Sequence, residues 1–448
     1  MVTAVCGLLL LLSVLVCTRI HRGSLFSPLT VFFTWNFVLL AMYDVGLRYG
    51  YFQLRLSFHA ELLYIGVFFC LFVGYLTVVL GGHRVRLGGP SDEVHPSLCG
   101  DVRAEMLRIA KVLILAYAVG LGWKYMMLVR TFGNPFANLR AIRLSLIEGR
   151  FSYPIVLTYM TLAANMAVLN LGVVFAFVKS HRRRVVGLIL VTFALLILDD
   201  LSIGARACPR LFIMLVSAAF VSYAVLGRKV TVRHVIAAGV CAVALMLLLG
   251  VVVYFRTSGQ VQLVEGIMVS SIYSNLVGNI PAFSYFVEHP WRQILPGYYT
   301  LGGVYQYIDR VLQRLFDLSF LPKAVYDHYD PARYADISSK LLFNTTNDLT
   351  SVYMDFGDIG VLVYGYLVGV VASYAFMRVE RRRMLFDVQF CALIVTAIVM
   401  NVRGIYFSAI GFWATIFLIV MQHLYLGAGR AEAVGHCGRR DSEQEVLV

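Results

Sequence analysis

Four arginines stand at the ends of apolar stretches of the chain, where a charge is costly. Arg206 and Arg210 lie in a short hairpin between two apolar runs, and Arg256 and Arg403 each stand at the end of another run. An ionisable group in or near the hydrocarbon of a membrane costs about 2.5–3.5 kcal/mol, which makes such a residue a candidate for function. The guanidinium group carries a planar fork of donors that suits phosphate. If the four side chains converge, they form a pocket for an anion such as a diphosphate.

A structural explanation of the same arginines is also open. Arg206 and Arg210 are four residues apart and would share one face of a helix that begins in the hairpin, so they repel each other unless an anion lies between them. Asp199 and Asp200 precede them in the chain and could supply that charge in salt bridges that close the hairpin. The other two arginines could instead extend to the lipid headgroups.

A carboxylate lies about two turns inside another apolar run. Asp355 follows a segment rich in asparagine and threonine that begins at residue 343. A buried carboxylate needs a partner, and one of the outward arginines is the expected one. Alternatively, Asp355 is a general base that accepts the proton of a sugar hydroxyl.

Other residues of this segment have a structural explanation. Asp348 and Thr350 are of the types that cap the N-termini of helices. Gly357 and Gly360 would allow a neighbouring helix to pack closely. We therefore expect a helix to begin near residue 348 and to pack closely at these two glycines.

The chain that positions these residues is strongly apolar. Hydrophobic residues make up 60% of its 448 residues and charged residues only 14%, whereas soluble domains are about half apolar and about a quarter charged. Apolar runs of about twenty residues are long enough to cross a hydrocarbon core of roughly 30 Å. We predict an all-α polytopic membrane protein with about eleven transmembrane helices. They fall at about residues 2–18, 26–45, 60–81, 106–129, 153–178, 185–201, 207–226, 233–255, 350–377, 388–402 and 406–427.

Basic residues predict how the chain is oriented in the membrane. Short clusters follow every odd-numbered run, for example Arg182, Arg183 and Arg184 after the fifth run and Arg382 and Arg383 after the ninth. The positive-inside rule places such loops in the cytoplasm. The N-terminus is then expected outside and the C-terminus inside. This topology also accounts for the net charge of +13, and no nucleic-acid motif accompanies it, so no nucleic-acid partner is expected.

Two segments on the outer side are longer than simple connectors. In 131–152, Asn134-Pro135 can open a helix that Gly149 can close, and its leucines suit a helix at the membrane interface. The segment 256–349 is rich in tyrosine and aliphatic residues, so we expect short helices that lie on the bilayer and cap a cavity. The chain then divides into helices one to eight (1–255), the large outer segment (256–349), helices nine to eleven (350–427) and a cytoplasmic tail (428–448).

The eight cysteines are scattered, and most fall inside apolar runs. No Cys-x-x-Cys pair or Cys/His cluster has the spacing of metal ligands. The sequence predicts neither a disulfide framework nor a metal site.

Three short segments resemble a known family. They are Gly204-Ala205-Arg206-Ala207 at the start of an apolar helix, the run that ends in Asp355-Phe356-Gly357-Asp358-Ile359-Gly360, and Arg403 near the end of the tenth run. They are similar to segments of the oligosaccharide repeat-unit polymerases, which include the Wzy-type O-antigen polymerases and their enterobacterial common antigen relatives. The number of spans and the long outer segment late in the chain are similar as well.

The resemblance implies a GT-C-like helical bundle and a metal-independent glycosyltransferase that needs no cofactor. Such an enzyme would act at the periplasmic face of the bacterial inner membrane on oligosaccharides linked to undecaprenyl diphosphate. Its product would be O-antigen, capsule or exopolysaccharide. The implied partners are the lipid-linked substrate, membrane lipids, a chain-length regulator and a flippase.

The resemblance also implies roles for individual residues. Arginines would hold the donor diphosphate and stabilise the charge that builds on it as it leaves. The expected catalytic residues are Arg206, Arg403 and Asp355. The expected substrate-binding residues are Arg210, Arg256, Asn344, Asn347 and Tyr353.

Two other functions fit parts of the pattern. An O-antigen ligase would share the span count and the arginine pocket, and it would rely on a histidine in the large outer segment, where His289 and His328 occur. A transporter or flippase for an anionic glycolipid would place its charges near the midplane and show internal repeats. The charges of this chain gather at one face, and no repeat is evident.

Overall fold

A computed structural model describes most of the chain and is helical throughout. The residues it describes are 1–20, 26–50, 54–84, 100–135, 138, 141–142, 145, 151, 153–177, 182–203, 207–226, 230–231, 233–241, 243–244, 276–289, 297–319, 347–401, 407, 409 and 411–427. No strand occurs in these ranges, which confirms the predicted all-helical class.

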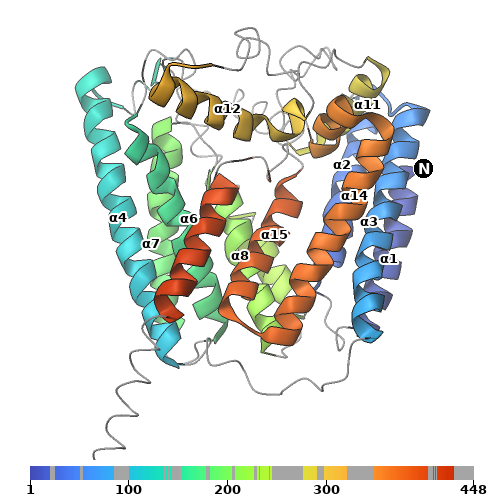
Figure 1. The fold of residues 1–448 in the computed structure, drawn as a ribbon, viewed down its shortest axis with the longest axis horizontal. Helices are drawn as coiled ribbons and strands as arrows, with labels where there is room; N and C mark the ends of the chain where they lie inside the picture. The colour runs from blue at the N-terminus through green and yellow to red at the C-terminus, as the bar shows by residue number, and fades with distance from the viewer. Residues whose placement is uncertain are drawn as a thin grey trace, which may run out of the picture.

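The long helices form one bundle with two sides (Figure 1). Helices α1, α2, α3 and α14 form one side, α4, α6 and α7 form the other, and α8 and α15 lie between them. Their bounds are α1 Val2–Ile20, α2 Pro28–Arg48, α3 Phe58–Arg84, α4 Gly100–Phe132, α6 Ile155–Phe177, α7 Arg182–Ile203, α8 Ala207–Val225, α14 Asp348–Arg382 and α15 Leu385–Met400. A further apolar helix spans Gly411–Gly427.

Six of the described helices are long and apolar enough to cross a membrane. They are Val2–Arg19, Pro28–Arg48, Phe58–Gly81, Val102–Phe132, Cys208–Val225 and Asp348–Arg382. The chain is therefore a multi-pass helical membrane protein, as predicted, but six helices meet this criterion where eleven were expected. Part of the difference lies in α15 and Gly411–Gly427, which are shorter apolar helices. Another part lies in α7, which carries three arginines at one end and two aspartates near the other.

Helices α3 and α14 approach each other so closely at two glycines that a larger side chain would not fit there. A β-carbon built on Gly369 would lie 2.2 Å from the carbonyl oxygen of Leu71, and one on Gly74 would lie 2.3 Å from that of Tyr366. Small residues permit such backbone contact between membrane helices. The closely packed glycines are thus Gly74 and Gly369, rather than the predicted Gly357 and Gly360.

Gly357 has a different role. Its backbone lies in a conformation that only glycine adopts readily, with φ 64° and ψ −158°, and the helix α14 bends there. Nothing lies within 4 Å of a β-carbon at this position. The glycine therefore kinks α14 between its first turns and its long apolar part.

The first turn of α14 also differs from the prediction. Asn347 is the N-cap: its Oδ1 accepts hydrogen bonds from the Thr350 amide and the Thr350 hydroxyl, both at 2.8 Å. Asp348 and Thr350, which were predicted as capping residues, instead occupy the first and third positions of the helix. The Asp348 side chain accepts the Leu349 amide of the same turn at 2.9 Å and also makes contacts outside the first turn.

Two helices of the segment 256–349 lie across one end of the bundle (Figure 1). They are α11 (Asn279–Glu288) and α12 (Tyr298–Phe316), and both contact α14. Tyr298 and Tyr299 are buried against the bundle, while Leu315 and Phe316 at the far end of α12 are exposed. Their location on the bilayer surface stays a prediction.

The segment 131–152 is described only in part. Helix α4 continues to Phe132, and the side-chain amide of Asn138 donates to the Phe132 carbonyl oxygen at 2.7 Å, which satisfies a group at the end of the helix. Most of the predicted interfacial helix, and the whole tail 428–448, lie outside the described residues.

Candidate functional site

The two aspartates near the end of α7 contact residues other than Arg210. Asp199 forms an ion pair with Lys124 of α4, with Nζ 3.0 Å from Oδ1, and accepts a hydrogen bond of 2.7 Å from the Tyr117 hydroxyl. The side chains of Lys124 and Asp199 are both 3% exposed. Asp200 accepts the backbone amide of Cys208 at 3.0 Å and so caps the start of α8. No described ion pair joins either aspartate to Arg210, and the suggested pairing with Arg206 lies outside the described residues.

Arg210 lies in the first turn of α8 and points into the bundle. Its Nη2 is 3.5 Å from Oδ1 of Asn165 on α6, and its Nε is buried with no hydrogen-bond partner in the described structure. Asn165 in turn donates to the hydroxyl of Thr415 at 3.1 Å. Among the described residues, no carboxylate lies within 4 Å of the Arg210 guanidinium. A positive charge thus lies between α6, α8 and the helix Gly411–Gly427 without a described counter-ion.

Asp355 joins the start of α12 to α14. Its Oδ1 accepts the Tyr299 amide at 3.1 Å, and its Oδ2 accepts the Thr300 amide at 2.6 Å and the Thr300 hydroxyl. The first residues of α12 have no cap from their own segment, because its N-cap is Gly297. The carboxylate supplies that cap from another helix. Burial, together with this carboxylate, raises the pKa of Tyr299.

Asp355→Ala is expected to loosen α12 from the bundle. The variant leaves the backbone amides of Tyr298, Tyr299 and Thr300 without this acceptor, at a cost of about 1–3 kcal/mol for each buried group. Hydrogen exchange of the α12 amides should become faster in the variant, while exchange in α3 stays unchanged. Asp358→Ala is the matched control, because Asp358 is exposed on the same helix and pairs with His59 at 3.1 Å. Equal exchange rates in both variants would show that Asp355 does not hold α12.

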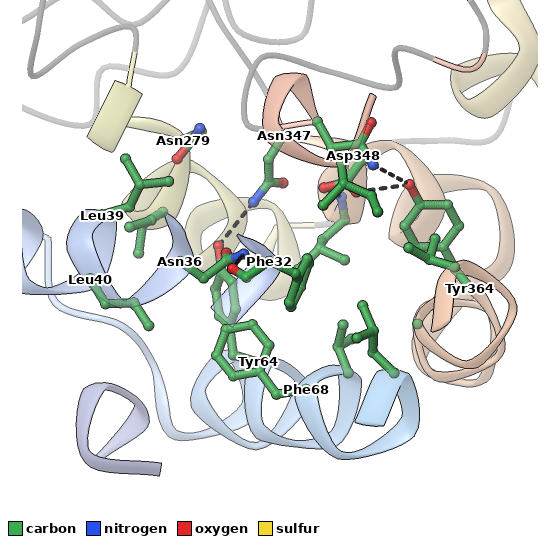
Figure 2. Close-up of a pocket in the computed structure, with 18 residues that line it drawn as sticks. Phe32, Asn36, Leu39, Leu40, Tyr64, Phe68, Asn279, Asn347, Asp348 and Tyr364 are labelled. Carbon is green, nitrogen blue, oxygen red and sulfur yellow. Dashed lines mark hydrogen bonds between the residues drawn. The ribbon is translucent and has the colours of Figure 1, made fainter. Parts of the chain in front are cut away.

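Asn347 and its neighbours line a cavity beneath α11 (Figure 2). The cavity has a volume of about 40 Å³ and is walled by α2, α3, α11, α14 and α15. The Asn347 side-chain amide donates to the Tyr64 hydroxyl at 2.9 Å. Asn36 and Asn279 contribute further amides to the wall.

Asp348 is the carboxylate of this cavity. Its Oδ2 accepts a hydrogen bond of 2.8 Å from the Tyr364 hydroxyl, which itself accepts the side-chain amide of Asn401 at 3.0 Å. The backbone of Asn401 closes the ring, because its carbonyl oxygen accepts the Asp348 amide at 3.1 Å. These groups fix the carboxylate on the wall of the cavity.

The structure describes four of the eight predicted site residues. Arg210, Asn347, Tyr353 and Asp355 are described, whereas Arg206, Arg256, Asn344 and Arg403 lie outside the described residues. Pairing of Asp355 with one of these three arginines therefore stays a prediction.

The four described residues do not form one cluster. Asn347 lines the cavity. Tyr353 packs on Phe283 of α11 and donates to the Val287 carbonyl oxygen at 3.3 Å. No hydrogen bond or ion pair joins Arg210 to the three residues of α14.

Several polar residues of the site were missed in the sequence. Tyr64, Tyr364 and Asn401 line the cavity, and Lys124 pairs with Asp199. A usable signal was present: each is a polar residue within or beside an apolar run, and polar groups in such runs face the bundle interior. Lys124 in particular is a charge within the predicted span 106–129.

Among the described residues, no group of three or more His, Cys, Asp or Glu side chains could hold a metal ion. Comparison of the chain with protein-family models, with curated proteins and with solved structures gives no match. The function must therefore be argued from the site itself.

Proposed function

We propose that this protein polymerises oligosaccharide repeat units linked to undecaprenyl diphosphate, as a metal-independent glycosyltransferase at the periplasmic face of a bacterial inner membrane. The observation that carries the proposal is Arg210, a guanidinium directed into a membrane bundle with no described carboxylate beside it. A charge in this position is costly unless it binds something. The diphosphate of a lipid-linked sugar supplies the matching charge.

The proposed reaction needs positive charge where the diphosphate leaves. When the bond from the donor sugar to the diphosphate breaks, negative charge builds on the leaving oxygen, and fixed donors that face it lower the barrier. In our proposal Arg206, Arg210, Arg256 and Arg403 hold this group. No described ion pair joins Asp199 to Arg210; the described partners of Asp199 include Lys124 and Tyr117.

The proposed arrangement in the membrane follows the basic loops. We place the N-terminus in the periplasm, the C-terminus in the cytoplasm, and α11 and α12 on the periplasmic side. The full count of eleven spans and the GT-C-like fold belong to this proposal. The position of α11 and α12 over one end of the bundle supports it, since a substrate would enter beneath them.

The proposal is tested in a strain that lacks the gene. Arg206→Ala, Arg210→Ala and Arg403→Ala are expressed there, and the surface glycan is separated on a gel. We expect the ladder to collapse to a single capped repeat unit, because loss of one such donor slows transfer by about 10²–10³-fold. Arg183→Ala is the control, since Arg183 is exposed at the opposite end of α7.

Other outcomes identify other functions. A ligase defect would leave no glycan attached, whereas a transport defect would leave lipid-linked units unpolymerised on the cytoplasmic side. An unchanged ladder in all three variants would rule out the arginine site.

A further inference from the structure

The cavity beneath α11 is suited to a small polar group rather than to a whole ligand. A water molecule needs about 10–15 Å³ of such space, so a cavity of about 40 Å³ holds about three groups of that size. Sites that bury an entire ligand measure roughly 300–1,000 Å³. The cavity can therefore take the hydroxyl-bearing edge of a larger molecule.

The wall of the cavity matches neutral hydroxyl groups. Its polar side chains are four asparagines, two tyrosines and one aspartate, and it contains no lysine, arginine or histidine. Amide and phenol groups both donate and accept hydrogen bonds, as hydroxyl groups do. A phosphate would meet the Asp348 carboxylate without a cation to offset it. The chemistry of the wall thus favours a sugar over a diphosphate.

The two carboxylates of α14 differ in what they face. Asp355 accepts three hydrogen bonds from Tyr299 and Thr300, and the backbone of Tyr298 donates to it as well, so it is occupied with the start of α12. Asp348 accepts the Tyr364 hydroxyl and the Leu349 amide, with its own amide and the Asn401 side chain also beside it. Of the two, Asp348 lines the cavity and Asp355 does not, so a hydroxyl group in the cavity meets Asp348.

We propose that this cavity binds the hydroxyl edge of the acceptor sugar and that Asp348 is the general base of the transfer. This inference rests on the proposed function. The acceptor hydroxyl oxygen forms a bond to the anomeric carbon of the donor sugar, and its proton passes to the Asp348 carboxylate. The bond from that carbon to the diphosphate oxygen breaks, and the diphosphate leaves with the electron pair. The proposed general base is thus Asp348 rather than Asp355.

The place of the cavity in the fold agrees with this role. It is lined by Asn347 and Asp348 at the N-terminus of α14 and by Asn279 of α11, so it lies at the end of the bundle that α11 covers. Asn401, which lines it, precedes the candidate diphosphate ligand Arg403 by two residues in the sequence. The acceptor and the leaving group would then be held by adjacent parts of the chain.

The test uses the purified full-length protein in liposomes with undecaprenyl-diphosphate-linked repeat units extracted from its own strain. Asp348→Asn keeps the size of the side chain and removes its charge. We expect the rate at saturating substrate to fall about 10²–10⁴-fold, the usual contribution of a general base. A general base loses activity when it is protonated, so we expect the wild-type rate to fall at low pH and this fall to be absent in the variant. Tyr64 and Tyr364 are the other titratable side chains that line the cavity.

Two further variants separate catalysis from folding. Asp358→Asn, on the exposed side of the same helix, should keep the wild-type rate. Tyr364→Phe removes a hydrogen bond but keeps the carboxylate, so it should slow transfer less than Asp348→Asn and retain the fall at low pH. If Asp348→Asn does not fold, the pH dependence of the Tyr364→Phe rate tests whether Asp348 is the base.

The outcomes distinguish the inference from the function on which it rests. If the wild type polymerises the units and folded Asp348→Asn keeps a rate within threefold and an unchanged pH profile, Asp348 is not the base. If Asp348→Asn does not fold and Tyr364→Phe shows no fall at low pH, the same conclusion holds. If the wild type forms no polymer at all, the proposed function itself is wrong.

Discussion

Alanine at Gly369 or at Gly74 is expected to lower the free energy of unfolding by about 3 kcal/mol, the upper part of the usual range for overpacking. The new methyl group would lie 2.2 Å or 2.3 Å from a backbone carbonyl oxygen of the facing helix, and backbone cannot turn aside as a side chain can. Helices α3 and α14 must therefore separate, and they share the most extensive contact between two helices in the bundle. Thermal unfolding in detergent measures the loss.

Gly81→Ala is the control for this prediction. Gly81 lies on α3 as Gly74 does, but nothing lies within 4 Å of a β-carbon there. Alanine favours a helix over glycine by about 1 kcal/mol, so this variant should be as stable as the wild type or more stable. If Gly74→Ala and Gly81→Ala unfold at the same temperature, the backbones of α3 and α14 are not in contact.

The helical class could be predicted from the sequence because the membrane imposes it locally. A chain that crosses hydrocarbon must satisfy its backbone hydrogen bonds within each segment, so an apolar run of sufficient length specifies a helix by itself. The number of spans was harder to predict. Helices such as α7 and α15 are bounded by charges or are short, and whether they cross depends on the neighbours that cover them.

Contacts between distant segments could not be predicted in this way. Asp355 was recognised as a buried carboxylate, but its described partners are amides of α12, more than fifty residues away. Nothing in the local pattern around Asp355 indicates which helix start will lie beside it. Asp348 shows the opposite error, because a local pattern suggested a cap and the fold made it part of a cavity.

The roles of the glycines could not be predicted for a related reason. Gly357 and Gly369 belong to the same helix, and the sequence alone gives both the same small side chain. Only the fold distinguishes them: Gly357 has a positive φ in open space, and Gly369 touches the backbone of α3. The backbone angle and the facing helix are properties of the bundle.

Removal of one partner from the Lys124–Asp199 pair is expected to destabilise the protein by about 3–5 kcal/mol, since it leaves a buried charge uncompensated. Both side chains are almost fully buried, and the Lys124 ammonium also lies 5.6 Å from the centre of the Tyr153 ring. Lys124→Met and Asp199→Leu should each show this loss in thermal or denaturant unfolding. The double variant should recover most of the stability, because apolar residues of similar size can replace a buried pair.

The two single variants and the double variant form a double-mutant cycle, and the exposed pair of Arg108 and Glu105 is its control. It has a similar N–O distance, 3.0 Å, but the Arg108 side chain is 77% exposed. Surface pairs contribute about 0–1 kcal/mol, so Glu105→Ala should change little. If the coupling energy between Lys124 and Asp199 is as small as that of a surface pair, the prediction is wrong.

The same cycle connects stability to the proposed chemistry. In Lys124→Met the Asp199 carboxylate loses its described cation, and Arg206 and Arg210 follow it in the sequence. If those arginines hold a diphosphate, a released carboxylate competes with it, so folded Lys124→Met should polymerise more slowly than its stability alone explains. The double variant lacks both the lysine and the competing carboxylate, and it should regain the rate. A rate restored in the double variant would show that Lys124 offsets the charge of Asp199 beside the substrate site.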